Sequence, residues 1–311
     1  MNVKAQITIV MPVRNRAGVV VRTLESIAAQ TWRPLSVVLV DNGSTDETVE
    51  VLRAWKATHE IAGLEITLLE EPMPGACRAR NRGLTAVKTP YVMFFDSDDV
   101  MSPTHVERAV KCLNENPDAD IVGWDVDCVM LDGSTRRLIF TRGNHLYSHL
   151  FHAGISTQRY VCRTELVRRV GGWNEDLASW NDYELGVRLL MCDPRIVYAG
   201  KEVTVTIYRQ TESITGTGFA SSPERWERSL DACESVLRLN DECRAIKWIE
   251  IRRAILAGHY AAEGCCDQSN RLLGEVLSRE KSWIKRMFYK FACRYTARGG
   301  RGVAILAKMI F

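Results

Sequence analysis

Short apolar runs alternate with amphipathic segments over the first 125 residues, and this alternation constrains the fold more than any other feature of the chain. Residues 35–40 are apolar at almost every position, which is typical of a strand that is covered on both faces. Segments with apolar residues at helical spacing separate this strand from its neighbours. The other predicted strands are residues 6–11, 66–69, 91–95 and 121–124. Strands connected through helices by short loops predict a doubly wound α/β sheet.

Helix signals lie between the predicted strands. Residues 17–30 and 76–87 carry apolar side chains at helical spacing, and Pro103 predicts the first turn of a further helix. Ser44 and Glu47 have the spacing of a capping box, in which two side chains bond the free amides of a helix start. We therefore expect this box to open the helix that follows the second strand.

The pattern changes after residue 125. Asp132-Gly133 lies between two segments of strand character and predicts a hairpin turn. From Ser222-Pro223-Glu224 onward the pattern is helical. The elements expected in this half are a helix at 164–170, strands near 195–199 and 203–208, and helices at 246–256, 272–277 and 283–295. We expect an α/β domain over residues 1–218 and a helical C-terminal region over residues 219–311.

Charge is unevenly distributed along the chain. The net charge of +3 is too small to indicate nucleic-acid binding, so we expect no nucleic-acid partner. From Lys281 to the end there are eight Lys and Arg residues and no acidic residue, which leaves a net charge of −5 for the rest. Apolar side chains interleave with these cations at helical spacing. Such a helix suits an anionic membrane surface, and the alternative is packing against protein.

The ten cysteines include no CxxC pair, which predicts free thiols in a reducing cytosol and not a disulfide framework. His259, Cys265 and Cys266 do not fit the spacing of a structural zinc site. The N-terminal segment does not resemble a signal peptide, and no apolar run has the ~18–20 residues of a membrane span. We expect a cytoplasmic protein that binds peripherally to the inner face of the plasma membrane.

An acidic cluster follows the apolar run 91–95, and it consists of Asp96, Asp98 and Asp99 with Ser97 between them. Grouped carboxylates repel one another unless a cation neutralises them. Mg²⁺ and Mn²⁺ prefer oxygen ligands and take the rest of their shell from water and phosphates. The cluster therefore predicts a divalent metal and a phosphorylated substrate at the carboxyl edge of the sheet, where open α/β sheets bind ligands.

Three further polar groups follow predicted strands and can converge on the same edge. They are Pro12-Val13-Arg14, Asp41-Asn42-Gly43-Ser44, and Gly75 with Arg78 and Arg80. Arginines at a helix start suit phosphate. Each group also has a purely structural interpretation: a turn with a helix cap, a solvated helix face, or, for the acidic cluster, a cap for the following helix.

Together these segments resemble the family 2 glycosyltransferases, which have the GT-A fold. The resemblance lies in ITIVMPVRNR (7–16), QTWRPLSVVLVDNGSTDET (30–48), GACRARNRGL (75–84), PYVMFFDSDD (90–99), GGWNED (171–176) and WNDYELGVRLL (180–190). It covers roughly residues 5–215. It implies a GT-A domain over residues 1–218, with a mixed sheet, and an inverting transfer of sugar from a nucleotide-diphosphate sugar.

The resemblance also implies roles for individual residues. Nucleoside contacts would come from Pro12, Val13, Arg14, Asp41 and Asn42, and diphosphate contacts from Gly75 and Arg80. Asp96 and Asp98 match the DxD motif, with Ser97 beside the donor, Asp98 as the direct ligand of Mg²⁺ or Mn²⁺, and Asp99 in support. Asp182 matches the catalytic base, and Trp173, Trp180 and Asn181 would lie on the acceptor side. The implied acceptor is a glycan or a lipid-linked glycan in bacterial surface polysaccharide synthesis.

Several alternatives stay open at this stage. Asp182 can instead cap the helix that follows it, and Trp173 and Trp180 can be core residues or sugar-stacking platforms. Relatives often carry Asp at position 42, Glu at position 181 and a His after the Tyr208-Arg209 pair, where Glu212 is a weak substitute. The histidines His145, His149 and His152 are better explained as surface or core residues than as ligands.

Two other functions compete with the transferase. The run Phe94–Val100 fits the hhhDxDxV signature of a haloacid-dehalogenase-type phosphatase, with Asp96 as nucleophile, but that signature belongs after the first strand of its core. A catalytically inactive sugar-nucleotide-binding domain is the non-enzymatic alternative, and the acidic residues Asp98 and Asp182 argue against it. A dinucleotide-binding dehydrogenase is excluded because no GxGxxG follows the first strand.

Overall fold

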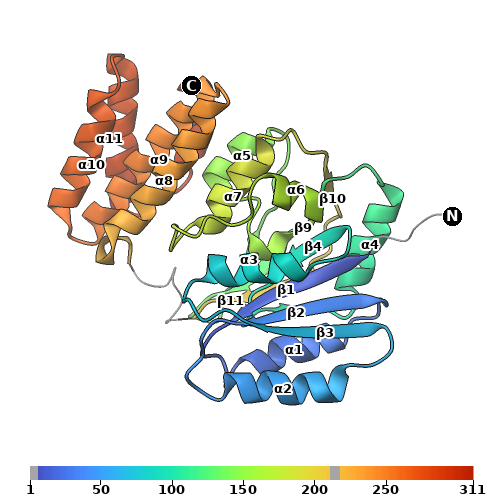
Figure 1. The fold of residues 1–311 in the computed structure, drawn as a ribbon. Coiled ribbons are helices and arrows are strands. Elements are labelled where there is room, and N and C mark those ends of the chain that lie inside the picture. The colour runs from blue at the N-terminus through green and yellow to red at the C-terminus, as the bar shows by residue number, and fades with distance from the viewer. Residues whose placement is uncertain (1–5, 211–217, 311) are drawn as a thin grey trace.

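The computed structural model describes residues 6–210 and 218–310. A seven-stranded sheet forms its centre, with strand order β10-β6-β9-β4-β1-β2-β3 (Figure 1). The bounds of these strands are β1 Ile7–Val13, β2 Leu35–Asp41, β3 Leu64–Glu70, β4 Tyr91–Phe94, β6 Ile121–Gly123, β9 Tyr160–Arg163 and β10 Ile196–Tyr198. All neighbours are parallel except β9, which runs antiparallel to both β4 and β6. The predicted mixed α/β sheet is confirmed.

Helices cover both faces of this sheet because its strands are apolar on both sides. One face packs against α1 (Val20–Ala28), α2 (Thr48–His59) and α4 (His105–Glu115). The other packs against α3 (Ala76–Ala86), α6 (Thr164–Arg169) and α7 (Asn181–Leu190). Gly83 of α3 lies so close to the sheet that a Cβ there would be 2.4 Å from Val10 Cγ1. A glycine is therefore required for α3 to approach β1.

A second sheet of four strands lies beside the carboxyl edge, in the order β5-β11-β7-β8. Its strands are β5 Val100–Met101, β7 Val126–Val129, β8 Thr135–Leu138 and β11 Val205–Tyr208. The hairpin predicted at Asp132-Gly133 joins β7 and β8. The sequence patterns predicted neither α5 (His145–His152) nor the strand β9.

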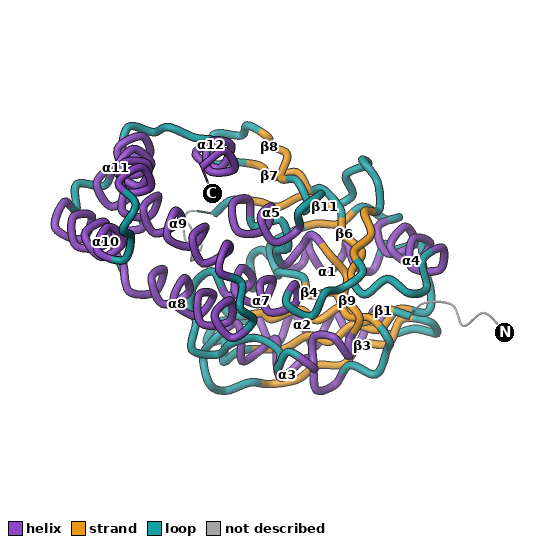
Figure 2. Tube along the Cα trace, turned by 90° about the horizontal axis from the view of Figure 1, so that it is seen from above, coloured by secondary structure: helices purple, strands orange, loops and turns teal. Residues whose placement is uncertain are grey.

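The C-terminal region is helical, as predicted. It contains α8 (Pro223–Leu239), α9 (Cys243–Ala262), α10 (Cys266–Ser278), α11 (Trp283–Ala297) and α12 (Val303–Ile310), the last of which the sequence patterns missed. Its apolar core includes Tyr147 and Leu150 of α5 and Tyr183 and Val187 of α7. The helices therefore pack directly onto the α/β part (Figures 1 and 2). No helix within the described ranges combines the length and apolar character needed to cross a membrane.

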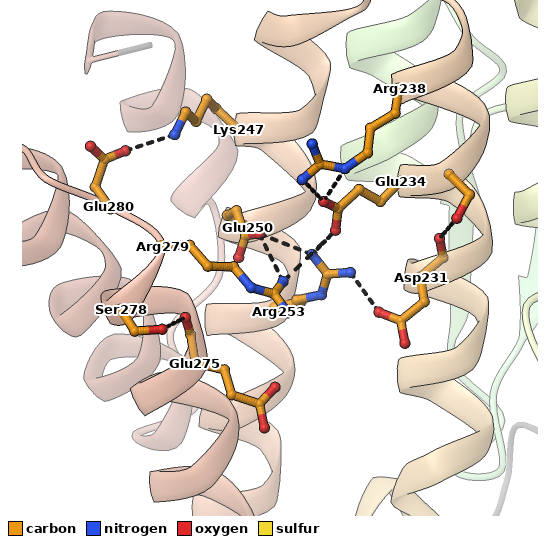
Figure 3. A network of polar contacts seen from close by, with 11 residues as sticks. Asp231, Glu234, Arg238, Lys247, Glu250, Arg253, Glu275, Ser278, Arg279 and Glu280 are labelled. Atoms are coloured by element: carbon orange, nitrogen blue, oxygen red, sulfur yellow. Dashed lines mark hydrogen bonds and ion pairs between the residues drawn. The ribbon is translucent and has the colours of Figure 1, made fainter.

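A buried ion-pair network joins the helices of this region (Figure 3). Arg253 is 2% exposed and contacts three carboxylates, at 2.6 Å from Asp231, 2.5 Å from Glu234 and 3.0 Å from Glu250. Because these partners come from α8 and α9, the network fixes how the two helices pack. It is structural and lies apart from the sheet edge.

The prediction that Ser44 and Glu47 form a capping box is wrong. The helix α2 begins at Thr48, and the Asp46 side chain accepts the Thr48 amide at 3.1 Å. The Ser44 hydroxyl instead accepts the Asn15 amide at 3.0 Å, from the loop after β1. Asn15 has a positive φ of 49°. Its side-chain oxygen in turn accepts the Thr45 amide at 2.8 Å. The residues that looked like a helix start therefore tie the loops after β1 and β2 together.

Candidate active site

One cavity of about 610 Å³ opens at the carboxyl ends of β1, β2 and β4, next to the starts of α3 and α7. This volume lies within the range of small-molecule sites. Segments far apart in the sequence meet here, as the sequence patterns predicted. The predicted site residues that line the cavity are Pro12, Val13, Arg14, Asn42, Gly75, Arg80, Asp96, Ser97, Asp98, Trp180, Asn181 and Asp182.

The buried Arg80 forms an ion pair with the partly exposed Asp96 in the cavity wall. The Arg80 Nη2 donates to Asp96 Oδ1 at 2.7 Å, and its guanidinium lies 4.3 Å from the Trp173 ring centroid. Burial lowers the pKa of Arg80, but Asp96 and the other acidic groups near it together outweigh this effect, and the net shift is upward. Gln158 Nε2 donates to the other Asp96 oxygen at 2.5 Å. Asp96 is therefore held rigidly by two donors.

The negative charge of Asp98 is less well neutralised by neighbouring cations than that of Asp96. Arg16 Nη2 lies 3.9 Å from Asp98 Oδ2, and Arg22 Nη2 bonds the Asp98 backbone carbonyl at 2.8 Å. Burial and the neighbouring Asp96 carboxylate raise the pKa of Asp98 to about 6. A carboxylate that is costly to ionise beside a second acid has a surplus of negative charge, which a cation would relieve.

Asp99 does not line the cavity, and its predicted supporting role at the metal is not favoured by its position. Its side chain is 2% exposed, and Oδ1 accepts the backbone amide of Tyr208 at 3.0 Å. Burial, Asp96 and Asp98 raise its pKa well above the ordinary value. Asp99 therefore anchors β11 to the loop after β4.

The residues around Asp96 and Asp98 fit a divalent ion with few protein ligands. Within residues 6–210 and 218–310, no three His, Cys, Asp or Glu side chains are grouped as a metal site. Glu212, the weak candidate for a third contact, lies outside the described residues. Two carboxylates with an open cavity beside them suit Mg²⁺ or Mn²⁺, which keep water and phosphate ligands.

Asn42 ties the end of β2 to the loop between β3 and α3, and Asp41 bonds the loop after β2. Asn42 Nδ2 donates to the Glu71 and Met73 carbonyls at 2.9 and 2.8 Å, and its Oδ1 accepts the Gly75 amide at 2.7 Å. An Asp could not donate the first two bonds. Asp41 is buried outside the cavity lining, where Oδ2 accepts the Ser44 amide at 3.2 Å. The position of Asp41 therefore does not favour the predicted direct contact with the nucleoside.

Asp182 lies in the first turn of α7 and faces the cavity. Its Oδ1 accepts the amide of Tyr183 at 2.8 Å. The N-cap of α7 is Trp180, with a φ of 49°, so the alternative interpretation of Asp182 as the helix cap is not supported. Burial raises the pKa of Asp182, and the positive charge of Arg80 partly offsets this. A carboxylate with a raised pKa is a stronger base than an exposed one.

The two tryptophans that were predicted on the acceptor side differ in their position relative to the cavity. Trp180 lines the cavity, and its acceptor-side role stays a prediction. Trp173 is 2% exposed and packs edge-on against Phe94 of β4, with ring centroids 5.1 Å apart. Asn81 holds the Trp173 backbone through two hydrogen bonds. The expected acceptor-side position of Trp173 is therefore wrong, and the core alternative is correct.

Among the clustered histidines, His149 has a structural role in the core. His149 is completely buried and its Nε2 lies 2.7 Å from the Tyr183 carbonyl, so it supports α7 from α5. Burial lowers its pKa to about 4. This ring is a neutral core residue at physiological pH.

Sequence reasoning missed several residues of the cavity. The cavity is also lined by Arg16, Cys77, Thr157 and residues 175–179. Gln158 donates a hydrogen bond to Asp96. Arg16 could have been predicted, because it ends the segment 7–16 that carries the family resemblance. Thr157 and Gln158 belong to a short 3-10 turn, η1 (Thr157–Arg159), that carries no local signal of its role.

Comparison with known proteins identifies the family to which the chain is similar. It matches the family described as Glycosyl transferase family 2 over residues 8–169, more than half of the 311 residues. It is 33% identical over 143 residues to the uncharacterized glycosyltransferase YibD of Escherichia coli, which covers 45% of this chain and 40% of YibD. It is 26% identical over 211 residues to a PGL/p-HBAD biosynthesis glycosyltransferase of Mycobacterium tuberculosis, covering 68% of this chain and 79% of that protein.

Solved structures show the same fold at low identity. A crystal structure of S. aureus TarS 1-349 in complex with UDP-GlcNAc has a TM-score of 0.72 at 17% identity, covering 98% of this chain and 92% of TarS. The mannosyltransferase PcManGT from Pyrobaculum calidifontis, in complex with GDP-Man and Mn²⁺, has a TM-score of 0.58 at 18% identity, covering 99% of this chain and 87% of PcManGT. The phosphatase alternative is not favoured. The chain has the GT-A fold and belongs to glycosyl transferase family 2.

Proposed function

We propose that the protein is an inverting glycosyltransferase that moves a sugar from a nucleotide-diphosphate sugar to a hydroxyl acceptor. The observation that carries this proposal is the meeting of Asp96, Asp98, Arg80 and Asp182 in one cavity. Membership of the family supports it, as do the UDP-GlcNAc and GDP-Man complexes of TarS and PcManGT.

The donor is proposed to bind along the sheet edge. Pro12, Val13, Arg14 and the Asn42 loop contact the nucleoside, because they lie at the ends of β1 and β2. The diphosphate lies along Gly75 and Arg80. Gly75 has a φ of 148° and precedes α3, so its backbone can approach a phosphate where a side chain would be strained.

A divalent ion, Mg²⁺ or Mn²⁺, is proposed to be held by Asp98 and Asp96 of the DxD motif. Such an ion, when bound, neutralises the negative charge that develops on a nucleotide leaving group. The remaining ligands come from water and the donor, since no third His, Cys, Asp or Glu side chain of the described residues is grouped with these two carboxylates.

Asp182 is proposed to accept the proton of the acceptor hydroxyl. The oxygen then attacks the anomeric carbon from the side opposite the diphosphate, the bond to the diphosphate breaks, and the configuration inverts. Burial strengthens Asp182 as a base by raising its pKa. Trp180 and Asn181, which precede it and line the same cavity, are the proposed contacts for the acceptor.

The proposed acceptor is a glycan or a lipid-linked glycan of bacterial surface polysaccharide synthesis. In this proposal the protein works in the cytoplasm, at the inner face of the plasma membrane, with residues 281–311 toward an anionic lipid surface. A catalytically inactive binding domain is the remaining alternative, and the positions of Asp98 and Asp182 in the cavity weigh against it.

The experiment is a binding screen by calorimetry with UDP-, GDP- and dTDP-sugars, with and without Mn²⁺. We expect one donor to bind in a metal-dependent way and Asp98→Ala to lose that dependence. Asp132→Ala serves as control, because this carboxylate lies in the exposed β7–β8 turn. Absence of metal-dependent binding for every donor would contradict the proposal.

A further inference from the structure

The helix α11 has apolar side chains on two sides. Its inner side, with Phe288, Tyr289, Ala292 and Cys293, is buried in the core of the C-terminal helices. It packs chiefly along α9 and also contacts α10. The fold of α11 is therefore explained by its inner side alone.

The outer side of α11 is also apolar. Trp283, Met287, Phe291 and Tyr295 follow one another at a spacing of four residues, and they are 73%, 55%, 41% and 39% exposed. Residues at this spacing lie on one face of a helix. Ile284 beside them is 53% exposed, and the Phe291 and Tyr295 rings stack with centroids 5.4 Å apart. We call these five residues the outer face of α11.

Cations accompany this face and acids do not. Arg294 is exposed on α11, and Lys281, Arg298 and Arg301 are exposed just beyond its two ends. No Asp or Glu occurs after Glu280. A large exposed apolar surface marks a binding site, and the cations restrict the partner to one with negative charge.

We infer that the outer face of α11 binds the surface of an anionic lipid bilayer. Apolar side chains, with Trp and Tyr among them, enter the interfacial region, and the flanking cations contact lipid phosphates. The alternative occupant is a second copy of the chain. A two-fold contact of this face with itself would bring the same cations together, which opposes it.

The position of α11 suits such a contact. Figures 1 and 2 both show α10 and α11 at the end of the molecule remote from β3 and α2. The bilayer can therefore approach the outer face without covering that part of the sheet. The inference makes the proposed membrane contact of residues 281–311 specific to one face, and it stands independently of the transferase chemistry.

The test is flotation of the full-length protein with vesicles of phosphatidylcholine alone or mixed with phosphatidylglycerol. We expect binding to the mixed vesicles only, and a loss of about tenfold in affinity for Trp283→Ser/Met287→Ser. A matched double variant, Ile61→Ser/Leu131→Ser, removes two exposed apolar side chains from the α/β part and should bind as the wild type does. Arg294→Glu/Arg298→Glu should also lose binding.

Equal binding by the wild type and Trp283→Ser/Met287→Ser, or no binding by the wild type, would overturn the inference. A wild-type dimer that this variant converts to a monomer, measured by light scattering, would assign the face to a second copy instead. Melting temperature and Mn²⁺-dependent nucleotide binding are measured on each variant. Because these readouts report on the fold and the cavity, a failure of the lipid inference stays distinct from a failure of the proposed function.

Discussion

At the scale of single residues, the chemistry of the cavity follows from which side chains come after each strand. The acids Asp96 and Asp98 were predictable because they come directly after a buried strand. The position of Asp99 could not be predicted from the sequence, because the amide that it accepts belongs to Tyr208, more than a hundred residues later. Trp173 was equally ambiguous, since a Trp beside a site can face the cavity or the core.

Asp98 should destabilise the metal-free protein. Its pKa is raised from 3.8 to about 6, so above pH 6 the carboxylate is ionised in both states and is less favourable in the folded one. We expect Asp98→Asn to raise the free energy of unfolding at pH 7 by at most about 3 kcal/mol. The gain should shrink as the pH falls through 6 and should become small near pH 4, close to the unfolded pKa of 3.8, below which both states are protonated.

Urea denaturation in EDTA between pH 4 and pH 7.5 measures this gain. Asp132→Asn, in an exposed turn, serves as the comparison and should leave the free energy of unfolding nearly unchanged across this range. A destabilised Asp98→Asn protein at pH 7 would show that the burial of this carboxylate is compensated elsewhere.

At the scale of elements, α8 and α9 reach the loop that carries the proposed base. Ser229 of α8 is completely buried and its hydroxyl donates to the Ser179 carbonyl at 2.5 Å. Trp226 packs against Trp180 with ring centroids 5.0 Å apart, and the Arg252 guanidinium lies 5.3 Å from the Trp180 ring centroid. The C-terminal helices therefore hold the turn that leads into Asn181 and Asp182.

Loss of this support should affect turnover more than binding. With the donor identified by the screen, we expect Ser229→Ala to lower kcat about tenfold and to leave donor affinity unchanged, because the base is displaced and the donor contacts are not. Ser235→Ala is the matched control, since that exposed hydroxyl bonds only a carbonyl within α8, at 2.9 Å. An unchanged kcat in Ser229→Ala would show that the turn holds its shape without α8.

The ion-pair network of Figure 3 gives a second prediction at this scale. Removing Arg253 leaves the buried carboxylates Glu234 and Glu250 without this partner. We expect Arg253→Ala to lower the free energy of unfolding by about 3–5 kcal/mol. Arg271→Ala, which breaks half-exposed pairs with Glu227 and Glu275, should cost less than about 1 kcal/mol. Urea denaturation of both variants measures the difference, and equal losses would contradict a special role for the buried network.

At the scale of the whole molecule, the order of strands and helices was predictable because hydrophobic periodicity is a local property. The strand β9 was not, because it is inserted antiparallel between β4 and β6, and that pairing depends on residues far away in sequence. The same limit applies to α5, whose buried apolar side chains Tyr147, Leu150 and Phe151 belong to the core of the C-terminal helices. The division at residue 218 follows the change of pattern, yet one apolar core crosses it.

A fragment of residues 1–218 tests that division. It would expose Tyr147, Leu150, Tyr183 and Val187, which are buried in the shared core. We expect the fragment to aggregate, or to melt well below the full-length protein, because each such side chain contributes roughly 1.5–3 kcal/mol when buried. A soluble fragment with the melting temperature of the whole chain would show two independent domains.

The central claim is that Asp182 is the base of a transferase whose donor binds beside Asp98. The most direct test compares Asp182→Asn with the wild type, using the donor found by the screen, Mn²⁺, and release of the nucleoside diphosphate as the readout. We predict unchanged donor affinity and a loss of at least about a hundredfold in turnover, because the amide cannot accept the proton. Wild-type turnover in Asp182→Asn would contradict the account.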